Sequence, residues 1–314
     1  MSEPVSPAGQ DYAQRLLQGE RLALARVISK LENRDRDAGA ILKEIYSQTG
    51  RAQVWGITGP PGAGKSTMVD QMIKVLRGRG LKVAVAAIDP SSPFTGGAIL
   101  GDRIRMQDHS SDPEVFIRSL GTRGKQGGLS HATLESVLAL DAAGFDVILV
   151  ETAGVGQTEL EILGLAQLVV VVLVPESGDS IQMMKAGLLE IADLFVVNKS
   201  DRPDAERLMH HLEGVLDLTP SLRPRPPILK AQANLGLGVE AIVEELQALA
   251  SKNQHLIAER QRDILKREVF HILSERLYSS VEMAFKTDSG KELLGQLEER
   301  KIDPISVADV LSGI

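Results

Sequence analysis

The sequence predicts an α/β fold, a doubly wound and mainly parallel sheet with helical extensions at both ends. Short runs of Val, Ile, Leu and Ala alternate with helical segments through the middle of the chain. Most of these runs are continuous rather than alternating with polar residues, which is typical of parallel strands covered on both faces. A glycine-rich turn after the first run, leading into a helix, is a further sign of a nucleotide-binding sheet.

The central elements follow in order from these patterns. Each strand is a short apolar run, and each helix carries apolar residues at a spacing of three or four. Strands are expected at 53–58, 82–88, 115–118, 146–151, 168–174, 194–197 and 227–231. Helices are expected at 65–79, 98–109, 128–143, 157–166, 179–192, 203–216 and 237–251.

Both ends of the chain lack strand patterns. Residues 9–48 predict two helices, the first with the apolar positions Leu16, Leu17, Leu22, Leu24, Val27, Ile28 and Leu31. Residues 254–285 predict one long amphipathic helix carrying Leu265, Val269, Ile272, Leu273, Leu277 and Val281. A short helix is expected at 290–300, and Asp303 with Pro304 predicts the start of another. The expected division is 1–48, 49–252 and 253–314, and the apolar stripes either pack on the central domain or form a dimer or partner surface.

The composition excludes several classes of protein. With 314 residues, 43% hydrophobic and 25% charged, the chain is long enough for one large globular domain or two smaller ones. It has no cysteine, so disulfides and thiolate metal sites are excluded. A net charge of −7 argues against a general nucleic-acid surface. No apolar run is long enough to cross a bilayer, and the polar residues 1–10 do not form a secretory signal, so we expect a cytoplasmic protein.

The first motif lies between the strand at 53–58 and the helix that follows it. It reads Gly59-Pro60-Pro61-Gly62-Ala63-Gly64-Lys65-Ser66-Thr67 and fits the phosphate-binding pattern G-x-x-x-x-G-K-S/T. The glycines permit a tight turn whose N–H groups face one anion, and the helix N-terminus adds a favourable dipole. Lys65 is expected to reach the β- and γ-phosphates, and the Ser66 hydroxyl to bind Mg²⁺. The alternative, a simple Gly/Pro turn, leaves the lysine and serine unexplained.

The second motif follows the strand at 194–197. Asn198-Lys199-Ser200-Asp201 fits N-K-x-D, and it lies at the carboxyl end of a strand, where open α/β sheets bind ligands. The Asp201 carboxylate can accept hydrogen bonds from N1–H and N2–H₂ of guanine, whereas adenine offers no donors there. Asn198 would brace the loop, and the Lys199 stem would cover one face of the base. Alone the motif also fits a surface turn, but together with the phosphate loop it predicts a GTPase.

Acidic residues between the two motifs are candidates for the metal and the switches. Asp89 ends the second strand, and Asp102 follows in a loop and helix, where the alternative is a solvent-exposed acid. The strand at 146–151 ends in Glu151-Thr152-Ala153-Gly154, at the place where a GTPase usually has D-x-x-G. Mg²⁺ uses one or two carboxylates beside phosphates and waters, which makes Asp102 a second candidate for the metal. Glu151 replaces the usual Asp, and its longer side chain is expected to bind Mg²⁺ through a water.

The residues expected to orient the attacking water differ from those of Ras-like enzymes. Ras-like enzymes place a glutamine directly after the glycine. Here that position is Val155, and the nearest glutamine is Gln157. We therefore expect slow hydrolysis that a partner completes. A further mobile segment is expected at 176–185, where Lys185 is either a switch residue or an ordinary surface lysine.

Taken together, these segments resemble the MeaB/ArgK GTPases. The segments that carry the resemblance are the loop 59–67, Asp89-Pro-Ser-Ser, Gly96-Gly-Ala-Ile-Leu-Gly-Asp102, Glu151-Thr-Ala-Gly-Val-Gly-Gln157-Thr-Glu and Asn198-Lys-Ser-Asp201. The resemblance covers residues 10–250 closely and the helical C-terminal extension in kind. It implies a P-loop G domain of the signal-recognition-particle class, flanked by helices that support a homodimer.

The family resemblance also implies a function. These proteins are G-protein chaperones of adenosylcobalamin-dependent acyl-CoA mutases, typically methylmalonyl-CoA mutase, and their GTP cycle gates cofactor loading. By the match, Lys65 and Ser66 hold phosphate and Mg²⁺, while Asp89, Asp102 and Glu151 form the metal shell. Gln157 and Lys185 would lie in switches that respond to the mutase, which is a separate chain here. The adenosyltransferase of the mutase is a further candidate partner.

Two points depart from or compete with this interpretation. The segment Lys230-Ala231-Gln232-Ala233 matches the guanine loop of relatives only loosely, although N–H groups at Gln232 and Ala233 are placed to reach guanine O6. The alternative function is a kinase that phosphorylates a transport protein or another partner. A kinase would need an acceptor pocket and would not need N-K-x-D.

No D-x-H-x-x-G segment is present, so we do not expect the chain to bind cobalamin itself.

Overall fold

The computed structural model describes residues 7–89, 107–109, 111–121, 131–152, 154, 158–175, 187–219 and 224–312. It divides into two compact units, Met1–Arg260 and Gln261–Ile314. The domain boundaries expected at residues 48 and 252 stay a prediction.

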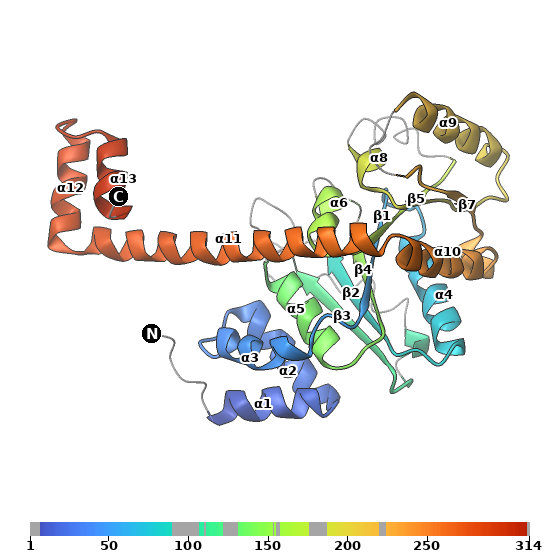
Figure 1. Ribbon diagram of the computed structural model, residues 1–314, viewed down its shortest axis with the longest axis horizontal. Coiled ribbons are helices and arrows are strands. Elements are labelled where there is room, and N and C mark those ends of the chain that lie inside the picture. The colour runs from blue at the N-terminus through green and yellow to red at the C-terminus, as the bar shows by residue number, and fades with distance from the viewer. Residues whose placement is uncertain are drawn as a thin grey trace. The chain divides into compact units, whose positions relative to one another are not determined.

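Within the described residues, seven strands form one sheet in the order β3-β2-β4-β1-β5-β6-β7 (Figure 1). The strands are β1 (Gln53–Thr58), β2 (Val83–Asp89), β3 (Val115–Gly121), β4 (Val147–Thr152), β5 (Leu168–Leu173), β6 (Leu194–Val197) and β7 (Ile228–Lys230). Every neighbouring pair is parallel, so the predicted doubly wound α/β fold is confirmed. Strand β3 runs three residues beyond its expected end, to Gly121, because it pairs with β2 as far as Asp89.

Helices connect these strands and cover both faces of the sheet. They are α4 (Lys65–Gly78), α5 (His131–Ala142), α6 (Thr158–Glu161), α8 (Leu188–Ile191), α9 (Ala205–Leu218) and α10 (Val239–Lys252). One face packs on α4 and α10, and these two helices also contact each other (Figure 1). The other face packs on α8 and α9 beside β5 and β6, and on α5 beside β2 and β4. The core is aliphatic apart from Trp55 and Phe195, which are fully buried.

One expected helix differs from the structure, and two others lie largely outside the described residues. The helix predicted at 157–166 is wrong beyond Glu161, because the chain tightens into a 3₁₀ turn at Ile162–Gly164. This turn packs directly on β1: a Cβ placed on Gly56 would lie 2.6 Å from Ile162 and 2.9 Å from Ala166. Of the helix expected at 98–109, only residues 107–109 are described, and they form a 3₁₀ turn. The helix expected at 179–192 is described only from residue 187 onward.

The N-terminal segment forms three helices where two were expected. They are α1 (Pro7–Leu17), α2 (Arg21–Asn33) and α3 (Ala38–Ile45). Gly19 breaks the first predicted helix, because its φ of +82° is a left-handed conformation that ends α1. Helices α2 and α3 pack on α5. Asp141 of α5 then accepts hydrogen bonds from the N–H groups of Gly50 and Ala52, which fastens the entry to β1.

The C-terminal residues form α11 (Gln254–Lys286), α12 (Asp288–Glu298) and α13 (Pro304–Ser312). Near the start of α11, Arg260 donates to both carboxylate oxygens of Asp193 at 2.7 and 3.1 Å. The helix expected at 290–300 begins earlier, at Asp288, because the Thr287 side chain caps it by accepting from the Gly290 N–H. None of the helices within the described ranges is long and apolar enough to span a membrane.

Candidate functional site

The loop of residues 59–66, called here the phosphate loop, joins the carboxyl end of β1 to the N-terminus of α4. Its first residue must be glycine, because Gly59 has φ of +137° and an added Cβ would lie 2.1 Å from the Val172 carbonyl oxygen. Beside it, the Thr152 hydroxyl bonds to the Thr58 hydroxyl at 3.0 Å and ties the ends of β4 and β1 together. The loop is therefore held against the central strands.

Lys65 places its charge inside the phosphate loop. Its side chain is buried, and Nζ donates to the carbonyl oxygens of Gly59 and Pro60 at 2.9 Å each. The ammonium group thus lies at the centre of the turn rather than in solvent. The N-terminus of α4 begins at the same residue, so the side-chain charge and the helix dipole favour an anion at the same place.

Ser66 and Glu151 bring two oxygen ligands together at this point. The Ser66 hydroxyl donates to Glu151 Oε1 at 2.6 Å, and both side chains are buried. Oxygen ligands of this kind, a hydroxyl beside a carboxylate, are those that Mg²⁺ prefers, so these residues fit the predicted metal. Asp89 ends β2 at the same edge of the sheet, but its side chain lies outside the described residues, as does Asp102.

Gly154, the glycine of the segment that replaces D-x-x-G, packs on the phosphate loop. Its φ is +78°, and an added Cβ would lie 2.3 Å from the Gly59 carbonyl oxygen and 2.5 Å from Lys65 Nζ. The main chain at Gly154 therefore runs alongside the Lys65 ammonium group. This is the position expected of a backbone group that responds to the terminal phosphate.

Asn198 joins the two motifs in space. Its side-chain Nδ2 donates to the Ala63 carbonyl oxygen at 2.8 Å, and its Oδ1 accepts from the Ala233 N–H at 3.0 Å. The side chain is buried, and Gly64 leaves room for it: a Cβ there would lie 2.5 Å from Nδ2. A single amide thus connects the phosphate loop, the end of β6 and the loop after β7.

A cavity of about 250 Å³, called here the base cavity, lies beside Asn198. Its lining comes from the phosphate loop, the N-K-x-D segment and the loop after β7, and consists of Gly64, Thr67, Asn198, Lys199, Asp201, Arg202, Ala233 and Asn234. Lys199 holds a left-handed conformation with φ of 55°, and the Ser200 N–H donates to the Ala231 carbonyl oxygen at 3.0 Å. The turn that carries Asp201 is thereby fixed against the neighbouring loop.

Most of the predicted site residues meet at this edge of the sheet. The residues brought together are Gly59, Pro60, Pro61, Gly62, Ala63, Gly64, Lys65, Ser66, Thr67, Glu151, Gly154, Asn198, Lys199, Asp201 and Ala233. Gln232 belongs to the same loop but does not line the base cavity, and its N–H bonds to the Leu237 carbonyl oxygen. Gln157 and Lys185 lie outside the described residues.

Two lining residues of the base cavity, Arg202 and Asn234, were not predicted. Each directly follows a predicted residue, Asp201 or Ala233, and that adjacency is the one signal the sequence offers. Whether a side chain at such a position lines the cavity depends on the turn that follows, which the motif does not specify.

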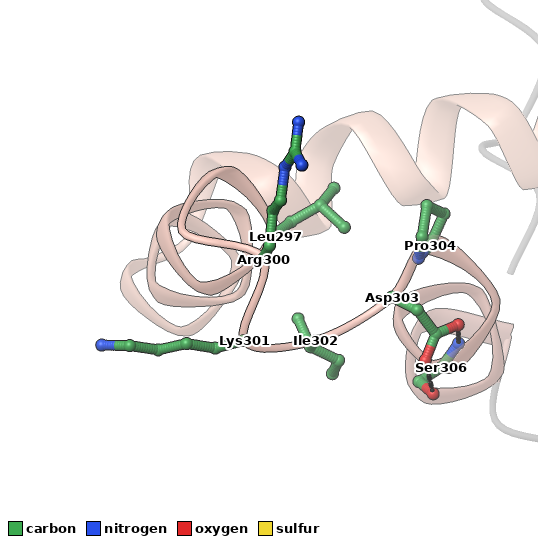
Figure 2. Close-up of a pocket in the computed structure, with 7 residues that line it drawn as sticks. All are labelled: Leu297, Arg300, Lys301, Ile302, Asp303, Pro304 and Ser306. Atoms are coloured by element: carbon green, nitrogen blue, oxygen red, sulfur yellow. Dashed lines mark hydrogen bonds between the residues drawn. The ribbon is translucent and has the colours of Figure 1, made fainter.

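A second cavity, of about 650 Å³, lies within the C-terminal unit and contains none of the motif residues (Figure 2). It surrounds the turn between α12 and α13. The Asp303 carboxylate accepts from the Ser306 hydroxyl and from the N–H groups of Ser306 and Ile305, and these bonds hold the pKa of Asp303 below its usual value. Figure 2 shows Arg300 and Lys301 extending away from this carboxylate. Asp303 is thus engaged in capping α13.

Comparison with known proteins agrees with the motifs. The family described as methylmalonyl-CoA mutase-associated GTPase MeaB matches residues 23–286. A Pyrococcus abyssi protein named as a GTPase is 45% identical over 308 residues, covering 96% of this chain and 95% of that protein. The GTPase ArgK of Escherichia coli is 44% identical over 191 residues, covering 60% of this chain and 58% of its own.

Two further matches extend the comparison. The mouse mitochondrial protein named methylmalonic aciduria type A homolog is 33% identical over 286 residues, covering 83% of this chain and 69% of its own. The solved structure titled LAO/AO transport system kinase is 27% identical, with a TM-score of 0.67 over 99% of each chain. The phosphate loop, the N-K-x-D segment and the sheet that brings them together accord with these matches, and the chain belongs to the MeaB family of methylmalonyl-CoA mutase-associated GTPases.

Proposed function

We propose that this GTPase is a chaperone that gates adenosylcobalamin loading and protection of a separate cobalamin-dependent acyl-CoA mutase. The observation that carries the nucleotide part is the meeting of the phosphate loop, Gly154 and the base cavity around Asn198. The partner is proposed from the family, whose name associates it with methylmalonyl-CoA mutase. The adenosyltransferase of that mutase is proposed as a second partner.

The residues divide the binding of GTP between them. Lys65 and the N-terminus of α4 neutralise the phosphates, while Asp201 selects guanine by accepting from N1–H and N2–H₂. We propose that Ser66 and Glu151, with Asp89 and Asp102, hold Mg²⁺, which supplies charge neutralisation at the terminal phosphates. The contact between Ser66 and Glu151 at 2.6 Å supports the first pair. GTP is hydrolysed to GDP and phosphate.

We propose that hydrolysis is slow alone and is accelerated by the mutase. The residue directly after Gly154 is Val155, whose side chain cannot orient a water by hydrogen bonding. Gln157 and Lys185 are the proposed groups that a bound mutase positions. Such completion in trans is how GTPase rates are commonly regulated.

The C-terminal helices are proposed to form a homodimer in the cytoplasm. On α11, Leu265, Val269, Leu273 and Leu277 follow one another at intervals of four residues, and their exposed fractions are 39%, 56%, 54% and 55%. An apolar stripe of this length on a single chain favours association with another surface. The measurement is the molar mass in solution by sedimentation equilibrium.

A kinase is the second candidate, because the related structure that covers 99% of this chain is titled a transport system kinase. The base cavity argues for guanine and hence for the GTPase. The two functions differ in the fate of the terminal phosphate. Nucleotide labelled at the γ-phosphate yields free phosphate in one case and a labelled partner protein in the other.

The experiment measures hydrolysis of GTP and of ATP, with and without each of several cobalamin-dependent mutases. We expect slow turnover selective for GTP, accelerated several-fold by one mutase, with no labelled protein. Lys65→Ala should abolish nucleotide binding. Lys74→Ala is the matched control, since Lys74 lies on the same helix, is half-exposed and pairs with Asp70 rather than with the phosphate loop.

Two results would contradict the proposal. Hydrolysis that no mutase changes would remove the chaperone function while leaving the GTPase. Preference for ATP together with a labelled acceptor protein would favour the kinase.

A further inference from the structure

Two buried threonine hydroxyls meet where β1 and β4 end. Thr58 is the last residue of β1 and Thr152 the last residue of β4, and both side chains are fully buried. The Thr152 hydroxyl donates to the Thr58 hydroxyl at 3.0 Å. Bulk water does not reach these positions, so breaking the bond leaves a hydroxyl without its partner. The site residues expected from the sequence include neither threonine.

The two threonines lie on the face of the sheet opposite Ser66 and Glu151. Side chains alternate along a strand, and Glu151, one residue before Thr152, contacts Ser66 on the face covered by α4. Thr152 therefore faces the other side, as does Thr58, whose neighbour on that face, Gly56, packs on the 3₁₀ turn after α6. The hydroxyl bond thus joins the two strand ends on one face, while the polar groups of the site lie on the other.

Beyond the threonines, both chains enter the site. Gly59 follows Thr58 directly. Gly154 lies two residues after Thr152. The two main chains are in close contact there, because a Cβ on Gly154 would lie 2.3 Å from the Gly59 carbonyl oxygen and 2.5 Å from Lys65 Nζ. A change in the separation of the strand ends therefore moves the main chain at Gly154, since so short a connection cannot absorb it.

This separation affects the two guanine nucleotides differently. The terminal phosphate of GTP would lie beside Lys65 and the main chain of Gly154, whereas GDP lacks that phosphate and is held by the phosphate loop alone. Displacing the main chain at Gly154 therefore lowers the affinity for the triphosphate. It also slows hydrolysis, because the rate depends steeply on the placement of the groups around the reacting phosphate.

We propose that Thr58 and Thr152 are positioning residues for hydrolysis, whose hydroxyl pair fixes the Gly154 main chain relative to Lys65 and thereby sets the preference for GTP over GDP. Both hydroxyls act through the main chain and contact neither the nucleotide nor the metal. This inference rests on the proposed function, because it places the terminal phosphate between Lys65 and Gly154.

The test compares GDP with a GTP analogue whose β–γ bridge is an imido group that resists hydrolysis. Affinities are measured by isothermal titration calorimetry with Mg²⁺ present, and kcat for GTP by phosphate release. Thr152→Val keeps the shape of the side chain but removes the hydroxyl. It should weaken binding of the analogue about three- to tenfold, as expected for one net hydrogen bond, while the affinity for GDP stays within about twofold of wild type. The kcat should fall as well.

Two further variants test whether the hydroxyl pair is responsible. Thr152→Ser restores the hydroxyl and should recover most of the preference for the analogue. Thr58→Val removes the same bond from the other strand, so it should give the same change as Thr152→Val, and the double variant should show no further loss. Thr58→Val also decides the question if Thr152→Val does not fold.

Ser136→Ala is the matched control. Ser136 is fully buried in α5, outside the site, and its hydroxyl donates to the Ala132 carbonyl oxygen at 2.6 Å. This variant loses a buried hydrogen bond but should keep the wild-type ratio of the two affinities.

The inference is overturned if Thr152→Val and Thr58→Val leave this ratio at its wild-type value, or if they weaken GDP binding as much as analogue binding. It is also overturned if Thr152→Ser behaves like Thr152→Val. Wild-type protein that binds the corresponding ATP analogue as tightly as the GTP analogue would instead contradict the proposed function.

Discussion

Asn198→Ala is the substitution that most directly tests how the two motifs are joined. It removes the bond to the Ala63 carbonyl oxygen at 2.8 Å and the bond from the Ala233 N–H at 3.0 Å. Asn198 is only 3% exposed, so the Ala63 carbonyl oxygen and the Ala233 N–H each lose a buried hydrogen bond. An unsatisfied buried group costs about 1–3 kcal/mol, and two such groups cost about 2–6 kcal/mol.

In the free variant the loops can relax so that the groups left unpaired reach water. GDP binding then has to restore the original arrangement of the loops, so the cost lowers the affinity for GDP. We expect the affinity for GDP to drop by about 30-fold or more, which corresponds to the lower end of this range. Asn198→Asp separates the two bonds. It keeps an acceptor for the Ala233 N–H but directs a carboxylate oxygen at the Ala63 carbonyl oxygen, so it should bind GDP no better than the alanine variant.

The assay is displacement of a fluorescent GDP analogue, with thermal unfolding measured on the same samples. Asn253→Ala is the matched control, because Asn253 lies between α10 and α11 and does not line the base cavity. The reasoning is refuted if Asn198→Ala binds GDP within about twofold of wild type, a difference well below the cost of even one unsatisfied group.

Two further predictions concern the edge of the site and the response to acid. Gly154→Ala should slow GTP hydrolysis strongly, because its Cβ would lie 2.3 Å from the Gly59 carbonyl oxygen and Gly154 has φ of +78°. Gly214→Ala is the control and should leave the rate unchanged, because an added Cβ there meets nothing within 4 Å. Equal rates for the two variants in a phosphate-release assay would contradict this prediction. The hydrogen bond from Arg77 lowers the pKa of Asp112 from its usual 3.8, so this pair stabilises the fold above that pH and the contribution is lost as the pH falls through the lowered value. Arg77→Met should therefore lower the unfolding midpoint more at about pH 7 than at a pH below the lowered pKa of Asp112, where only the loss of the bond from Arg77 to the Leu81 carbonyl oxygen remains. A deficit independent of pH would exclude this charge effect.

Local patterns were enough to predict the strands. Each strand is an apolar run whose pattern depends only on burial on both faces of a parallel sheet, and all seven observed strands correspond to predicted runs. The ends of helices were predicted less accurately where a tertiary contact determines the last helical residue. The turn at Ile162–Gly164 follows from its close packing on Gly56, a residue more than a hundred positions earlier in the chain.

The site residues likewise divide into those that the sequence identified and those that only the tertiary structure revealed. The sequence by itself identified the phosphate loop and the N-K-x-D segment, because each is a continuous motif contained within one turn. Only the tertiary structure decided that Asn198 holds Ala63 and Ala233 together, and that Asn234 lines the base cavity. These contacts join loops at the ends of β1, β6 and β7, and no local pattern records which side chains meet where separate strands end.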